Sequence, residues 1–261
     1  MGIKIVFVGA GNLATNLAKE LFRKGNHIVQ VFSRTMESAQ FLASQVNAEA
    51  VTDIADVMAG ADLYVLSIKD STLESVIGKL SGKGRNGLFV HTAGSMPMDV
   101  FKGYAARYGV MYPMQTFSKN RAVDFREIPF FIEANTPEDA ELLRSISLTM
   151  TEKVYELSSD RRKYLHLAAV FASNFANHCY ELCDEILSEH GIPFDVMLPL
   201  IGEIADKVRS MSPKEAQTGP ALRYDANVIG KQEKLLAGNT RIRGIYNLMS
   251  DSIHAVAMDE K

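Results

Sequence analysis

A short apolar run followed at once by a glycine-rich turn constrains this chain more than any other feature. Residues 3–8 are mostly apolar and β-branched, which is typical of a buried parallel strand. The next six residues, 9–14, read Gly-Ala-Gly-Asn-Leu-Ala and fit the spacing G-x-G-x-x-A. Leucines at positions 13, 17 and 21 then share one helical face. The stretch therefore predicts a strand, a tight turn and a helix, in that order.

This order is the context in which such glycines bind the pyrophosphate of a dinucleotide. Gly9 would form the tight turn, Gly11 would let the backbone approach the phosphates, and Ala14 would let the helix pack closely on the strand. The free N–H groups at the start of the helix, at Asn12 and Leu13, would face the phosphates. A glycine turn that binds nothing is the alternative, but the surrounding strand and helix favour the dinucleotide.

The end of the second expected strand, His27 to Phe32, bears on the choice of dinucleotide. NAD enzymes place an acidic residue here, about 20 residues after the glycines, to bind the ribose diol. This chain has Ser33-Arg34-Thr35 instead. Because Arg34 is planar and permanently charged, it suits the 2′-phosphate of NADP. We expect NADP rather than NAD at this position, and a solvated surface arginine is the alternative.

Alternating strand and helix patterns continue to about Leu157, and only helical patterns follow. This alternation predicts an α/β protein with a doubly wound, mostly parallel sheet of the Rossmann type. We expect a dinucleotide-binding domain over residues 1–157 and an all-α domain over residues 158–261. Further strands are expected at residues 50–51, 61–68, 87–91, 110–115, 128–133 and 153–157.

Composition excludes several classes of partner. The net charge of −3 supplies no basic field for nucleic acid or an anionic membrane. No apolar run approaches the about 20 residues that span a bilayer. The first strand starts without a signal peptide, so we expect a cytoplasmic protein. Two cysteines, Cys179 and Cys183, are too few ligands for zinc, and we expect reduced thiols and no metal site.

Small and polar residues follow two of the expected strands. Ligands of open parallel sheets bind at the carboxyl ends of strands. Gly94 and Ser95, after the strand that ends at His91, could hold the substrate or the nicotinamide amide. His91 could donate a proton, and a core histidine bonded to backbone is the alternative. Four further residues at these strand ends are expected to border the cofactor: Ser67, Ile68, Lys69 and Thr92.

Polar side chains also share one face of the long helix expected after Asp160. Because polar groups among apolar neighbours are costly unless they are paired or face a cleft, this face suggests a substrate site. A hydrogen-bonded contact with another helix is the alternative. Arg223 could bind a substrate carboxylate, or it could pair with Asp225. The four polar residues of the helix face are His166, Ser173, Asn174 and Asn177.

The glycine turn followed by Phe32-Ser33-Arg34 resembles the β-hydroxyacid dehydrogenase and pyrroline-5-carboxylate reductase group. Residues 91–95, 164–174 and 217–225 are similar to a branch described as Rossmann-like, with a helical C-terminal domain of unknown function. That branch is often labelled as NADP oxidoreductases of the coenzyme deazaflavin-dependent type. The resemblance implies an NADP-binding domain and a helical domain that packs against its copy, so we expect a homodimer through the C-terminal helices.

The chain departs from its relatives at two positions that bear on mechanism. Where many relatives have His-Pro, this chain has Tyr112-Pro113, so Tyr112 would have to replace that histidine. The lysine that catalyses in hydroxyacid dehydrogenases has no match, because Val170 stands four residues before Asn174. The catalytic groups are therefore expected among His91, Tyr112, His166 and Asn174, and the proton donor stays open between the first three and water.

The leading hypothesis is an NADP-dependent oxidoreductase that transfers a hydride to or from a small ketone or imine bearing a carboxylate. One alternative is hydride exchange between NADP and a deazaflavin, which needs a wide cleft. Another is an NADP-binding sensor without catalysis, which fits the missing lysine.

Overall fold

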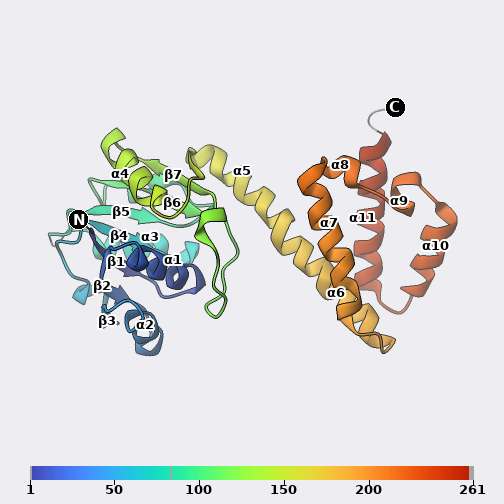
Figure 1. Cartoon of the computed structure of the whole chain (residues 1–261), viewed down its shortest axis with the longest axis horizontal. Helices are drawn as coiled ribbons and strands as arrows, with labels where there is room; N and C mark the ends of the chain where they lie inside the picture. The colour runs from blue at the N-terminus through green and yellow to red at the C-terminus, as the bar shows by residue number, and fades with distance from the viewer. Residues whose placement is uncertain (1, 83, 259–261) are drawn as a thin grey trace. The chain divides into compact units, whose positions relative to one another are not determined.

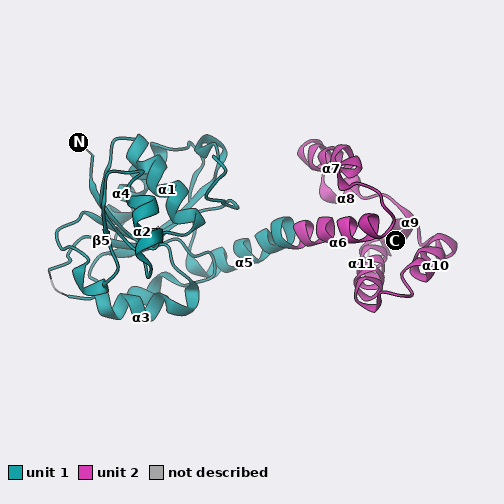
Figure 2. Cartoon of the chain, turned by 90° about the horizontal axis from the view of Figure 1, so that it is seen from below, with its two compact units in different colours: residues 1–174 teal, residues 175–261 magenta. Residues whose placement is uncertain are grey.

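The structure is a computed structural model that describes residues 2–82 and 84–258 (Figure 1). The chain divides into two compact units, which Figure 2 colours separately. We call residues 1–174 the sheet unit and residues 175–261 the helical unit. The sequence pattern places a domain boundary after residue 157, where the strands stop, whereas the division into compact units falls later, within the helical region.

The sheet unit contains one eight-stranded sheet with the order β3-β2-β1-β4-β5-β6-β7-β8. The first six strands of this order run parallel, β7 is antiparallel to β6, and β8 is parallel to β7. The predicted α/β class is thereby confirmed, and the last two strands extend the sheet. The strands are β1 (Lys4–Val8), β2 (His27–Phe32), β3 (Glu49–Val51), β4 (Leu63–Leu66), β5 (Leu88–His91), β6 (Tyr108–Pro113), β7 (Phe130–Ala134) and β8 (Val154–Glu156).

Alternating side chains of the strands build a core on each face of the sheet. Phe7 of β1 faces one core, which includes Leu17 of the first helix, whereas Val6 faces the other, which includes Leu73 and Ile77. The α-helices are α1 (Asn12–Arg23), α2 (Met36–Ala43), α3 (Asp70–Leu80), α4 (Pro137–Leu148) and α5 (Ser159–Ala169). α1, α2 and α4 contribute to the first core and α3 to the second, so helices cover both faces.

The register of the sheet brings several chain segments to one edge. Leu66 at the end of β4 lies opposite His91 at the end of β5, and His91 lies opposite Val110 of β6. Val8 of β1 lies opposite Leu66. Because these strands are parallel, the residues that follow them share the carboxyl edge of the sheet, where ligands of such folds bind.

The long helical segment after Ser158 is interrupted by a π-helix. α5 ends at Ala169, a π-helical segment spans Val170–Phe175, and α6 (Ala176–Glu189) follows. A π-helix has more residues per turn than an α-helix, so residues beyond it do not keep the face that a continuous 3.6-residue period predicts. The expectation that His166 shares a face with the polar residues from Ser173 onward assumed a continuous α-helix, and the π-helical segment removes that assumption.

The helical unit has a small core among its described residues. Its buried side chains include Leu182, Leu187 and Ile242, while α7 and α10 bury none. Within the described part of the chain, each helix is too short or too polar to traverse a lipid bilayer. Besides α6, the helices are α7 (Leu198–Ser210), α8 (Pro213–Ala216), α9 (Pro220–Arg223), α10 (Ala226–Leu235) and α11 (Thr240–Met258), and a 3-10 turn spans Phe194–Met197.

Candidate cofactor and active site

The turn between β1 and α1 requires glycine at its first position. Gly9 has a φ of +116°, which L side chains rarely adopt. Its N–H donates a 2.8 Å hydrogen bond to the carbonyl of Phe32. A Cβ atom at Gly9 would lie 2.2 Å from the carbonyl oxygen of Ser67 and 2.9 Å from a methyl carbon of Ile68. The turn therefore packs directly against the end of β4.

Gly11, in contrast, faces open space at the start of α1. No described atom lies within 4 Å of the position where its Cβ would be. No side chain caps the helix, and its first turn holds no acidic residue. The first N–H groups of the helix, from Asn12 to Ala14, are therefore available to an anion, and the helix dipole favours one there. An anionic group such as a phosphate would fit this helix start, and dinucleotide binding by these residues stays a prediction.

The end of β2 presents Ser33 and Arg34 beside the start of α2. The Ser33 N–H donates to the carbonyl of Val51, and Thr35 is the N-cap residue of α2. Arg34 is exposed and forms no ion pair with a described residue. The first acidic residue after the strand is Glu37, which is exposed in the first turn of α2.

Ser67 and Thr92 connect the carboxyl ends of β4 and β5. The Thr92 hydroxyl donates a 3.2 Å hydrogen bond to the Ser67 hydroxyl, and the Thr92 N–H donates to the carbonyl of Leu66. Since the Ser67 carbonyl contacts Gly9, the structure brings the glycine turn and both strand ends together. Lys69 is exposed at the N-cap of α3.

His91 is fully buried, and backbone groups occupy both of its ring nitrogens. Nδ1 accepts a 3.1 Å hydrogen bond from the Ala93 N–H, and Nε2 lies 3.3 Å from the carbonyl oxygen of Pro97. These partners assign the proton to Nε2. Burial, together with the charge of Arg162, lowers the pKa of His91 to about 4. This geometry matches the alternative of a core histidine that holds a turn.

Gly94, Tyr112 and His166 meet in direct contact. The Tyr112 hydroxyl lies 3.2 Å from Nδ1 of His166, and the two rings meet edge to face. A Cβ at Gly94 would lie 2.4 Å from the same Nδ1, so only glycine allows α5 to approach this turn. Burial raises the pKa of Tyr112, and the nearby Arg162 opposes that rise. The group joins the segments after β5, at the end of β6 and on α5.

Four further residues of the predicted site are exposed: Ser95, Ser173, Asn174 and Arg223. The exposed Ser95 hydroxyl donates a short hydrogen bond to the Asp70 carboxylate at the start of α3. Ser173 and Asn174 are exposed in the π-helical segment. Arg223 is exposed on α9 of the helical unit, and Asp225 caps α10 by accepting from the Val228 N–H rather than pairing with Arg223.

Sequence reasoning missed a buried charged group beneath this contact. Arg162 is 1% exposed. Its guanidinium donates a 2.7 Å hydrogen bond to the carboxylate of Glu133 in β7 and a 2.6 Å hydrogen bond to the carbonyl of Met96. The Ser159 hydroxyl donates a 2.6 Å hydrogen bond to the same carboxylate. The spacing in the sequence could have indicated this residue. Arg162 stands four residues before His166, and residues four apart share a helical face.

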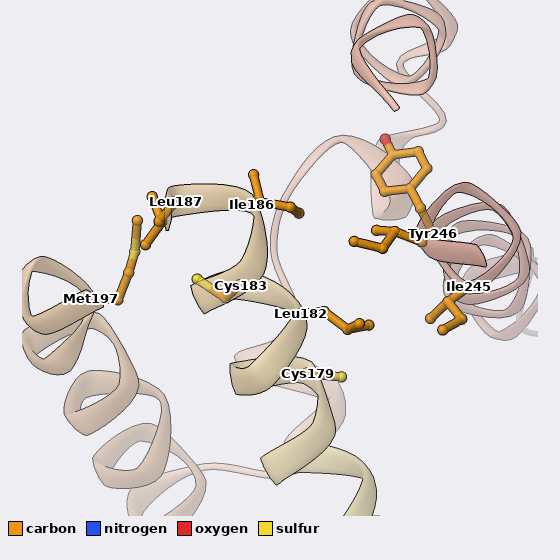
Figure 3. A pocket seen from close by; sticks show the side chains of 9 residues that line it. Cys179, Leu182, Cys183, Ile186, Leu187, Met197, Ile245 and Tyr246 are labelled. Atoms are coloured by element: carbon orange, nitrogen blue, oxygen red, sulfur yellow. The ribbon is translucent and has the colours of Figure 1, made fainter. Parts of the chain in front are cut away.

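The cysteines of the helical unit border an apolar pocket of about 340 Å³. Cys179 is exposed and Cys183 partly buried, and neither forms a disulfide. Among the described residues, no cluster of three His, Cys, Asp or Glu side chains is placed to hold a metal ion. Figure 3 shows the pocket between α6, Met197 and α11; its labelled lining includes Leu182, Ile186, Leu187, Ile245 and Tyr246.

Two family models match this chain. Residues 4–93 match the family model described as "NADP oxidoreductase coenzyme F420-dependent", and residues 128–253 match a domain of unknown function, DUF2520. No curated protein matches the chain in sequence.

Solved structures extend the likeness over the whole chain. A pyrroline-5-carboxylate reductase from Streptococcus pyogenes shares the fold at 15% identity and a TM-score of 0.64, over 97% of this chain and 99% of that one. An imine reductase from Myxococcus stipitatus in complex with NADP+ shares it at 17% identity and a TM-score of 0.61, over 98% and 93%.

A protein from Bacteroides fragilis, described as a "putative NADP oxidoreductase", is much more similar. It is 55% identical, the match covers 97% of this chain and 98% of that one, and the TM-score is 0.94. This identity, with the two family models, shows that the chain belongs to this family of NAD(P)-dependent oxidoreductases, in which an NADP oxidoreductase domain precedes the C-terminal domain of unknown function.

Proposed function

We propose that the protein transfers a hydride from NADPH to the C=O or C=N group of a small substrate that bears a carboxylate. The observation that carries this proposal is the contact between Tyr112, His166 and Gly94 at the carboxyl edge of the sheet. Reduction of either bond needs a hydride, which bound NADPH supplies, and a proton, which the protein must deliver to the oxygen or nitrogen.

Tyr112 is the proposed proton donor. Burial raises the pKa of its phenol, so the side chain is protonated near neutral pH and is able to donate. His166, 3.2 Å away and only partly buried, is placed to return a proton to the phenolate after each turnover. His91 then serves to hold the turn that carries Thr92 and Gly94, because its own nitrogens are bonded to backbone.

NADP rather than NAD is the proposed cofactor. Arg34 is exposed at the end of β2 and has no described ion-pair partner, so its guanidinium is available to a 2′-phosphate. The uncapped start of α1 at Gly11 supports binding of the pyrophosphate. Thr92 and Ser67, bonded to each other beside the glycine turn, are proposed to border the nicotinamide end.

The proposed substrate class is supported by the chemistry of the contact and by the activities of two proteins that share the fold, a pyrroline-5-carboxylate reductase and an imine reductase. Ser95, Ser173 and Arg223 are exposed polar groups of the predicted site, and Arg223 has the fork geometry that binds a carboxylate. Asn174 is proposed to orient the substrate.

A homodimer through the helical unit is also proposed. Large apolar side chains are exposed on several of its helices: Leu200 is 58% exposed, Leu235 is 85% exposed and Leu248 is 72% exposed. Exposed apolar surface of this extent is typical of an interface between subunits. An apolar pocket lined by residues of α6 and α11 and by Met197 also lies in this unit (Figure 3).

Hydride exchange with a deazaflavin is a second candidate, favoured by the description of the family model that matches residues 4–93. The test is NADPH consumption by the purified protein with three groups of acceptors: cyclic imino acids, 2-keto acids and an oxidised deazaflavin. We expect turnover with members of the first two groups and its loss in Tyr112→Phe. Turnover with the deazaflavin alone would favour the second candidate, and tight NADPH binding without turnover would favour a sensor.

A further inference from the structure

Arg162 is a buried cation whose neutralisation rests on one partly exposed carboxylate. The side chain of Arg162 is 1% exposed and that of its partner Glu133 is 18% exposed. Besides the Glu133 carboxylate, its guanidinium reaches the Met96 carbonyl and, at 3.0 Å, the Ser159 hydroxyl. Its Nε–H is buried and has no hydrogen-bond partner among the described residues. Burying such a charge is costly, so its presence beside the proposed site needs an explanation.

The contacts of Arg162 fix the first turns of α5 onto the sheet. Glu133 belongs to β7, Met96 follows the turn after β5, and the Ser159 hydroxyl accepts a 2.8 Å hydrogen bond from the Met98 N–H. His166 lies four residues further along α5, about one helical turn, on the same side. The arginine therefore sets the position from which His166 reaches Gly94 and Tyr112.

The charge of Arg162 also acts on the groups of the site. It lowers the pKa of Tyr112 against the effect of burial, and it lowers the pKa of His91. The charged and titratable groups around Tyr112 and Arg162 are His166 on α5, Glu133 of β7, which lies opposite Val110 of β6, and His91 at the end of β5. Asp70 at the start of α3 acts in turn on His91.

We propose that Arg162 is a positioning residue for the proton-donating pair, which holds His166 against Gly94 and Tyr112 and stabilises the phenolate that Tyr112 becomes when it gives up its proton. This inference rests on the proposed function in its choice of Tyr112 as donor. It goes beyond that function in assigning a role to a buried charge that cannot touch the substrate. A purely structural ion pair would hold α5 in place without acting on the ionisation of Tyr112.

The test is a pH titration of Tyr112 in the full chain, by NMR of protein with ¹³C-labelled tyrosine. The chain has nine tyrosines, and the Tyr112 signal is identified by its absence from Tyr112→Phe. In Arg162→Met we expect this signal to titrate about one pH unit higher than in the unchanged protein, because the stabilising cation is gone. Arg162→Lys keeps the charge and should restore most of the difference.

Two further variants keep the result interpretable. Arg162→Met/Glu133→Gln removes both partners of the ion pair, so it can replace Arg162→Met in the titration if the single variant fails to fold. Arg107→Met/Asp139→Asn is the matched control, because it removes another arginine–carboxylate pair, between Arg107 just before β6 and Asp139 on α4. An unchanged Tyr112 titration in folded Arg162→Met, or an equal change in the control, would overturn the proposal. The titration needs no substrate, so a failure of the turnover test leaves this result readable on its own.

Discussion

The sheet unit and the helical unit bury their apolar side chains to very different extents. The strands β1, β4 and β5 bury nearly all of their residues, and both core clusters lie within the sheet unit. In the helical unit, α7 and α10 bury no residue, and Leu235 and Leu248 are mostly exposed. We therefore expect the sheet unit to be stable as one chain, and we expect a further surface to cover the apolar side chains of the helical unit.

The proposed chemistry follows the same division. The glycine turn at residues 9–11, the ends of β4 and β5, and the contact of Tyr112 with His166 all lie in the sheet unit. The helical unit supplies exposed groups such as Arg223. We infer that cofactor binding and proton transfer depend on the sheet unit, while assembly depends on the helical unit.

The largest expected effect is the loss of the dimer in Leu248→Glu. If the 72% exposed Leu248 lies in the interface, both copies lose the burial of a leucine, at about 1.5–3 kcal/mol for each copy. Leu148→Glu is the control, because Leu148 is 50% exposed on α4 of the sheet unit. Light scattering at micromolar concentration should give a dimer for the control and a monomer for Leu248→Glu. A monomeric unchanged protein would contradict the proposed assembly.

The two glycines of the β1–α1 turn should separate stability from cofactor binding. Gly9→Ala places a Cβ against the Ser67 carbonyl at a positive φ, so we expect about 2–4 kcal/mol of lost stability. Gly11→Ala meets no described atom and should leave the melting temperature unchanged, while NADPH binds about tenfold more weakly. Thermal melts and NADPH titrations measure both effects, and an equal loss of stability in the two variants would refute this assignment.

His91 should make the sheet unit sensitive to acid. An unfolded histidine binds a proton near pH 6.5, but folded His91 does so only near pH 4. The contribution of His91 to the free energy of unfolding is therefore fully present above about pH 6.5. It falls by about 3 kcal/mol as the pH decreases towards 4. Urea unfolding at several pH values should show this slope, and His91→Gln should remove that part of it. The same slope in both proteins would show that His91 is not its source.

A smaller effect than the loss of stability expected for Gly9→Ala concerns the choice of cofactor. Arg34→Ala should weaken NADPH about 10- to 100-fold and leave NADH nearly unchanged, because only NADPH carries the 2′-phosphate. Fluorescence titration with each cofactor gives the ratio. An equal loss of affinity for NADPH and NADH would mean that Arg34 does not bind the 2′-phosphate.

Features determined by neighbouring residues were predictable from the sequence. The strand, tight turn and helix predicted at the start of the chain are observed in that order as β1 and α1, because an apolar β-branched run, glycines and leucines at helical spacing are local signals. Gly9 and Gly11 were predictable for the same reason, since a tight turn and an open helix start are requirements of the local backbone.

Features that depend on contacts between residues far apart in the sequence were not predictable from the sequence. The burial of Arg162 depends on Glu133, 29 residues earlier, and a pair of adjacent arginines at 161–162 is typical of a solvated face. The contact between Tyr112 and His166 spans 54 residues and depends on the register of β6 and on the position of α5. The π-helical segment has no recognisable sequence signal here, so the face expected for Ser173 and Asn174 assumed a regular period.

One measurement tests the central claim, that the contact of Tyr112 with His166 delivers the proton while the glycine turn holds the cofactor. NADPH affinity and the rate of a single turnover should be measured together for the unchanged protein, Tyr112→Phe and His166→Ala, with the imino or keto acid that is turned over. We predict nearly unchanged NADPH affinity and a rate that falls about 10²- to 10⁴-fold in the variants. An unchanged rate in both variants, or a loss of NADPH affinity as large as the loss of rate, would contradict the claim.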